Sequence, residues 1–416
     1  MNLKTIILLM LLPLGLSAQQ TITLEECWSN ARKQMPALQN LQALDQLDSL
    51  EQLILKTNYL PKLNANAQAT WQSDVTSVEI PMPGFSIDEP SKEQYKATVE
   101  ISQLIWDGGR TKALRQNQQI ETALTKAETE AAFFPVKQRV ASLYFALMLS
   151  QKQLELTQQL ISTLDKKLNE LDAAVTQGVV REAGKYVLQA EKLQAAQDLS
   201  DQKFQAKAVA DMLNVLTGLD IQYSDSLASP NARIPETVKR HQLTIYELQQ
   251  DAAVSMSEVL QKNRMPVFNA FAQAGYGKPG LNMLKNEADS WLMVGAGVSW
   301  NIFDWNKTSR QKQQLKVQEQ MVDHSREQFL QQVNIEKQKY LAEMEQYRAA
   351  LTKDEEIIKL REKITRDYSS QLKQGTVTSS AYVEELFKEQ SARISKEIHA
   401  IKLTQSQIEL QILLEK

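Results

Sequence analysis

The sequence is poor in residues that interrupt helices and in residues that build chemical sites. It has 13 glycines and 11 prolines among 416 residues, while Gln, Leu, Lys, Glu and Ala are abundant. This composition is typical of long helices. A single cysteine, Cys27, excludes an intrachain disulfide, so packing or assembly must stabilise the fold. The three histidines are scattered, and no nucleophile, metal or phosphate-loop motif is present. We therefore expect no cofactor and no enzymatic activity.

The chain also lacks a strong charge bias and a long apolar run. The formal net charge of −3 offers no electrostatic basis for binding nucleic acid. Lys4, an apolar run over 6–16 and small residues at 17–18 predict a signal peptide over residues 1–18. The alternative is a membrane anchor, but the run is too short to span a bilayer. Cys27 does not lie where cleavage would leave it first, so we expect an exported chain without lipid.

The chain contains an internal repeat. "QLIWDGGRTKALRQ" corresponds to "WNIFDWNKTSRQKQ", which aligns Asp107 with Asp304 (304 − 107 = 197). Gly178 and Gly375 have the same offset (375 − 178 = 197). "PKLNANAQA" also matches "PVFNAFAQA" further upstream. Three landmarks in the same order indicate two tandem copies. We assign residues 19–218 to the first copy, 219–235 to a linker and 236–416 to the second copy.

Each copy is expected to form a tall helical hairpin. The segment from about 108 to 176 has no glycine after its start and Pro135 as its only proline, which predicts a helix of about 100 Å. The segment from about 305 to 373 predicts a second long helix. In the first of these, steps of three and four residues form a coiled-coil seam, at positions 140, 143, 147, 150, 154, 157, 161, 164, 168, 171 and 175. Two shorter helices placed end to end would pack along each long helix and complete the hairpin. They are about 23–58 and 180–217 in the first copy, and about 236–263 and 377–415 in the second. Gly178 and Gly375 would permit the tight bends between them.

Strand patterns occur only at the other end of each hairpin. Apolar and polar residues alternate in four segments, around 62–71, 95–102, 268–276 and 292–300. Such alternation with aromatics near the strand ends is typical of transmembrane β-strands. A soluble sandwich is the alternative, although the sequence offers no other strands for it to pack on. Four strands cannot close a barrel, and an open edge is not viable in lipid, so several chains must share one barrel.

These residues resemble the TolC family of outer-membrane channel proteins over essentially the whole mature chain. "LIWDGGR" is close to that family's strand-to-helix signature, and "NIFDWNK" is a diverged second copy. The junction residues are Asp107, Gly108, Gly109 and Asp304; both aspartates are also natural N-caps. The resemblance implies a mainly α fold with a small transmembrane β part. Three chains would form an α-helical barrel and a shared twelve-stranded β-barrel in the outer membrane of a Gram-negative bacterium.

The resemblance also implies sites at the bends. In the family the corresponding turns dock onto periplasmic adaptor hairpins, which points here to Gly178, Val179, Val180, Gly375, Thr376 and Val377. They could also be ordinary turn residues. Acidic residues narrow the family's periplasmic mouth, and Glu384 matches one such position as a candidate channel-lining group. Ala381 occupies the other position. Leu372 and Val377 stand where some members have the tyrosine and arginine of a latch.

The implied function is a passive exit duct in a tripartite efflux pump or a type I secretion system. Its partners would be two further copies of itself, a periplasmic adaptor, an inner-membrane RND or ABC transporter, and outer-membrane lipid. The alternative is a periplasmic coiled-coil scaffold or adaptor without a pore. The four amphipathic strands favour the channel. The cargo and the pump type are not encoded in these patterns.

Overall fold

The computed structural model describes residues 21–77, 89–178 and 181–415, and within them two compact units. The expected signal peptide lies outside the described residues. One unit comprises Met1–Gln39, Thr129–Arg240 and Phe329–Lys416, and the other comprises Asn40–Glu128 and His241–Gln328. Each unit therefore draws on both sequence copies. The copy boundaries inferred from the sequence remain a prediction.

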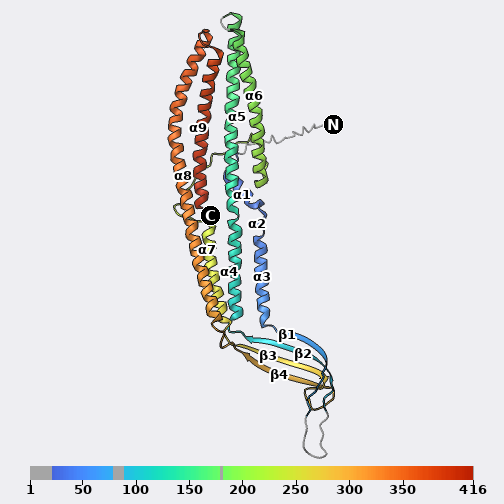
Figure 1. The fold of residues 1–416 in the computed structure, drawn as a ribbon. Coiled ribbons are helices and arrows are strands. Elements are labelled where there is room, and N and C mark those ends of the chain that lie inside the picture. Colours follow the sequence, from blue (N-terminus) through green and yellow to red (C-terminus); the bar gives the residue numbers. More distant parts are fainter. Residues whose placement is uncertain (1–20, 78–88, 179–180, 416) are drawn as a thin grey trace, which may run out of the picture. The chain divides into compact units, whose positions relative to one another are not determined.

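The first unit is a set of long helices (Figure 1). It contains α1 (Leu24–Gln34), α2 (Pro36–Gln39), α5 (Phe133–Thr176), α6 (Glu182–Thr217) and α9 (Ser379–Leu414), and α8 (Lys307–Lys373) contributes to both units. Helix α5 contacts both α6 and α9, so it joins the hairpins of the two copies. No helix among the described residues is long and apolar enough to cross a bilayer.

The predicted seam of α5 is confirmed. None of its eleven positions is exposed, and eight of them are buried: 140, 143, 147, 157, 161, 164, 168 and 171. Toward the glycine turns, seam residues of α5 form an apolar cluster with residues of α6, α8 and α9. Periodic apolar burial, rather than helix propensity, therefore holds these helices in place.

Two of the predicted helices are interrupted. The helix expected over 108–176 is divided at Ala132 into α4 (Arg110–Ala131) and α5. Pro135 lacks the N–H that would bond the carbonyl of Ala131, which explains a local break. The helix expected over 23–58 is divided into α1, α2, α3 (Leu41–Lys56) and the 3₁₀ turn η1 (Thr57–Tyr59). Met35 is extended because it precedes Pro36.

The second unit contains α3, η1, α4, α7 (His241–Lys262) and a four-stranded sheet. The strands are β1 (Lys62–Trp71), β2 (Glu93–Trp106), β3 (Val267–Lys278) and β4 (Asp289–Ser299). They are antiparallel and follow sequence order, which places β1 and β4 at the edges (Figure 1). The four predicted strands are confirmed, and β2 joins the first copy to the second through β3.

The two faces of the sheet differ as the alternation predicted. One row across the four strands shows this: its paired residues all lie on the apolar face, and they are Leu63, Ile101, Ala272 and Val294. Leu63 and Val294 are 69% and 73% exposed. Along β2 from 97 to 104 the residues of the apolar face are exposed, whereas those of the polar face are half-buried. This arrangement is the reverse of a sheet that covers a water-soluble core.

The buried seam gives a stability test. Leu164 is fully buried in the apolar cluster of α5, so Leu164→Ala should destabilise the protein by about 2–5 kcal/mol through lost burial and a residual cavity. Thermal unfolding followed by circular dichroism should show a lower midpoint for this variant. Lys166→Ala, at an exposed position of the same helix, should leave the midpoint nearly unchanged. Equal midpoints for the two variants would contradict the seam.

Candidate functional site: glycine turns and strand-to-helix junctions

The junction between β2 and α4 is built around Asp107. Its carboxylate accepts hydrogen bonds from the N–H groups of Gly109 at 3.0 Å and Thr111 at 2.7 Å, as an N-cap does. The Tyr59 hydroxyl donates to it at 2.6 Å and ties the end of η1 to the junction. Burial opposes ionisation of this carboxylate, but the hydrogen bonds from Thr111, Tyr59 and Gly109 hold its pKa below the ordinary value.

The second copy repeats this backbone with different side chains. The carboxylate of Asp304 accepts from the N–H of Thr308 at 3.0 Å. Trp305 and Asn306 have φ of 53° and 60°, and their counterparts Gly108 and Gly109 have φ of 70° and 86°. Positive φ is sterically disfavoured for tryptophan, so the rest of the junction must hold Trp305 in this conformation against its backbone strain. The repeat is therefore a repeat of backbone conformation as well as of sequence.

The two junction glycines have different surroundings. A Cβ on Gly108 would overlap the Cβ of Met265, which follows α7. A Cβ on Gly109 would make only ordinary contacts with Lys262, at 3.9 Å. Both close approach and positive φ thus favour glycine at position 108, whereas φ alone favours it at position 109.

The turn between α5 and α6 begins at Gly178, which has φ of 74°. Its N–H donates to the Val175 carbonyl at 2.9 Å and so closes the end of α5. A Cβ placed there would meet no atom within 4 Å among the residues that the structure describes. The residue is therefore needed for its backbone conformation and not for a close contact. Val179 and Val180, the other predicted docking residues of this turn, lie outside the described residues.

The turn between α8 and α9 is a Schellman cap. Gly375 has φ of 70°, and its N–H donates to the Leu372 carbonyl at 3.1 Å. The N–H of Thr376 reaches back to the Gln371 carbonyl at 3.0 Å. Val377 is half-buried against the apolar cluster, and Thr378 then caps α9 by accepting from the N–H of Ala381 at 3.2 Å. Both glycines have the positive φ that the bends predicted.

A buried lysine connects the two hairpins near their turns, and no pattern in the sequence predicted this connection. Lys167 on α5 is 4% exposed, and its Nζ donates to the Ser369 hydroxyl at 2.7 Å and the Ser369 carbonyl at 3.2 Å. It also pairs with Glu170 at 3.0 Å and lies over the Tyr382 ring. Burial opposes ionisation of Glu170, but Lys167 and Lys373 hold its pKa below the ordinary value. The position of Lys167 directly before the seam residue Leu168 could have indicated that this lysine is buried.

Glu384 lies on the exposed side of α9. Its carboxylate pairs with Lys388 at 2.7 Å, and its side chain is 67% exposed. It borders a hollow of about 510 Å³ whose lining includes Val187, Val383 and Phe387. Leu372, at one latch position of the family, is instead fully buried in the apolar cluster. Glu384 as a channel-lining group remains a prediction.

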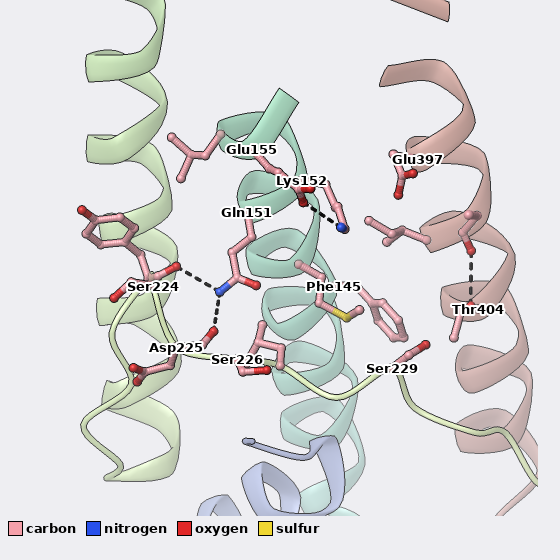
Figure 2. Close-up of a pocket in the computed structure, with 16 residues that line it drawn as sticks. Phe145, Gln151, Lys152, Glu155, Ser224, Asp225, Ser226, Ser229, Glu397 and Thr404 are labelled. Atoms are coloured by element: carbon pink, nitrogen blue, oxygen red, sulfur yellow. Dashed lines mark hydrogen bonds and ion pairs between the residues drawn. The ribbon is translucent and has the colours of Figure 1, made fainter. Parts of the chain in front are cut away.

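The segment between the two copies is fastened to α5 (Figure 2). The Gln151 amide donates to the carbonyls of Tyr223 at 3.0 Å and Asp225 at 2.8 Å. The buried Tyr144 hydroxyl donates to the Ala228 carbonyl at 2.7 Å. A hollow of about 630 Å³ lies among this segment, α5 and α9, with Phe145 among its lining. Among its polar lining residues, Gln151 binds the linker, which gives this side of the hollow a structural role.

The junction glycines yield a matched pair of variants. Gly109→Ala should cost about 1 kcal/mol, because only positive φ opposes it. Gly108→Ala should cost clearly more, because the same strain is joined by overlap with Met265. Thermal midpoints of the two purified variants would show the difference. A Gly108→Ala variant as stable as Gly109→Ala would contradict the close approach at this junction.

The comparisons with known proteins agree with this geometry. Residues 28–219 match the family described as outer membrane efflux protein. No curated protein matches the chain.

Among solved structures, the chain is similar to CusC, with a TM-score of 0.70, 14% identity, and coverage of 94% of this chain and 92% of CusC. It is similar to VceC from Vibrio cholerae, with a TM-score of 0.64, 16% identity, and coverage of 94% of each chain. It is also similar to the open state of MtrE from Neisseria gonorrhoeae, with a TM-score of 0.65, 16% identity, and coverage of 94% and 88%. The resemblance read from the sequence is confirmed: residues 28–219 match the outer membrane efflux protein family, and the chain as a whole has the fold of these channels.

Proposed function

We propose that this chain is the passive outer-membrane exit duct of a tripartite efflux pump or a type I secretion system. The observation that carries the proposal is the sheet, which has one exposed apolar face and two edge strands. Lipid would cover the apolar face, while neighbouring copies would pair with β1 and β4. Three copies would close twelve strands into a barrel wide enough for a channel.

The helical unit would continue the conduit into the periplasm. Its long hairpins end at Gly178 and Gly375, and one apolar cluster packs α5, α6, α8 and α9 together near these ends. An adaptor would dock there on exposed residues of the turns, including Thr376, and on the predicted contacts Val179, Val180 and Val377. Glu384 would lie near the mouth. The energy for transport would come from an inner-membrane RND or ABC transporter.

Pore formation tests the duct directly. The mature chain, extracted from outer membranes in detergent, should be trimeric and should conduct ions when inserted into planar bilayers. Mass determination by light scattering and single-channel recording provide the measurements. A water-soluble monomer without conductance would favour the alternative of a periplasmic scaffold and end the channel proposal.

The glycine turns give a second test, which separates docking from assembly. Gly178→Val has open space for its side chain, so only the strain of positive φ, about 1 kcal/mol or more, opposes it. Gly375 has nearly the same φ as Gly178, so valine at position 375 would meet the same backbone strain. We expect both variants to form normal amounts of outer-membrane trimer but to lose export, because altered turns would displace the docking residues.

The control places the same side chain where the backbone accepts it. Gln177→Val lies one residue before Gly178 at φ −85°, so it should retain both trimer and export. Trimer content and substrate export would be measured in the same cells. Normal export by Gly178→Val and Gly375→Val would mean that these glycines are ordinary turn residues and that docking lies elsewhere.

A further inference from the structure

The polar face of the sheet has an apolar region on β3 and β4. In the register of these strands, Phe271 lies opposite Gly295, and Trp291 lies opposite Gly275. Between these two pairs, Gln273 lies opposite Met293. Each strand thus contributes one aromatic residue and one glycine, in a reciprocal arrangement. Glycine weakens a strand interior and often marks a close approach, so two glycines opposite two aromatics require an explanation.

The glycines make room for the rings. A Cβ on Gly275 would overlap Cζ2 of Trp291, and a Cβ on Gly295 would lie 2.7 Å from Cζ of Phe271. Each ring therefore leans across onto the glycine of the neighbouring strand instead of standing away from the sheet. Met293, 39% exposed, lies between the two pairs. We call Phe271, Met293 and Trp291 the aromatic strip.

A carboxylate borders the strip on β2. The three β2 residues opposite this part of β3 are Thr98, Glu100 and Ser102, of which only Glu100 is charged. The Gln273 amide donates to its Oε2 at 3.1 Å, which holds the carboxylate beside the strip. In the next row toward the strand ends, Lys96 and Asp289 both pair with Gly277 and balance each other in charge. Lys62 lies one strand farther away, on β1.

We propose that the aromatic strip with Glu100 is a contact site for planar organic cations moving through the duct. This inference depends on the proposed function, because the strip faces the channel only if the opposite, apolar face meets lipid. The face of an aromatic ring attracts cations and stacks with flat apolar groups. The held carboxylate of Glu100 adds attraction for positive charge, and three copies would supply three such sites around the barrel.

Current block in planar bilayers tests the site. Ethidium, a planar cation, should reduce the ion current of the trimer at a lower concentration than a planar aromatic sulfonate of similar size. Trp291→Leu and Phe271→Leu keep apolar bulk over the glycines but lose the rings. Each should raise the half-blocking concentration of ethidium about two- to fivefold. Glu100→Gln should raise it for ethidium but not for the sulfonate.

Leu292→Ala provides the control, because Leu292 lies on the opposite face and is 71% exposed. It should leave ethidium block unchanged, and normal single-channel conductance would verify assembly of every variant. Unchanged ethidium block in both ring variants, with conductance intact, would overturn the contact site and leave the duct standing. A wild-type trimer that conducts no current would instead overturn the proposed function.

Discussion

The hydrogen bonds between β2 and β3 join the two halves of the sequence into one sheet. Each copy supplies only two strands, and a two-stranded ribbon is marginally stable on its own. Pairing across the copies gives four strands but still leaves β1 and β4 at the edges, each with a row of backbone N–H and C=O groups facing outward. In lipid such groups must be paired, so the sheet is complete only within an assembly. Helix α5 also joins the two copies, because it packs on α6 of its own copy and on α9 of the other.

The duplicated backbone has been kept while its side chains have diverged. Gly108 and Gly109 adopt positive φ without steric cost, yet Trp305 and Asn306 adopt it at the equivalent positions. In both copies an aspartate carboxylate caps the helix that follows. A fixed path from strand to helix is therefore imposed by the cap and by the strand register, and glycine makes that path easier without being indispensable to it.

The sequence predicted the sheet better than it predicted the helices. The alternation of apolar and polar residues was enough to predict the two faces of all four strands. Successive side chains of a strand point to opposite faces, so a difference between the faces appears in the sequence as a period of two. The α5 seam was predictable for the same reason. The breaks at Met35 and Ala132 were missed although Pro36 and Pro135 signalled them. Proline suits the first turn of a new helix, where both residues lie, but disrupts the interior of a continuous helix. Lys167 was missed because its partner Ser369 lies on the other copy, so no local pattern shows the contact.

Lys167 joins the two hairpins near the ends that carry the glycine turns. A buried cation is costly unless it is paired and hydrogen-bonded, and here Ser369, Glu170 and the Tyr382 ring meet that requirement together. Those partners come from α5, α8 and α9. A shift of one hairpin along the other would remove the hydrogen bonds of Lys167 to Ser369 and its contact with the Tyr382 ring, and would leave only Glu170 of its own helix. Apolar contacts in the same cluster tolerate small displacements, whereas hydrogen bonds to one ammonium group do not. The buried lysine thus favours the relative register of the hairpins in which Ser369 and Tyr382 lie beside it.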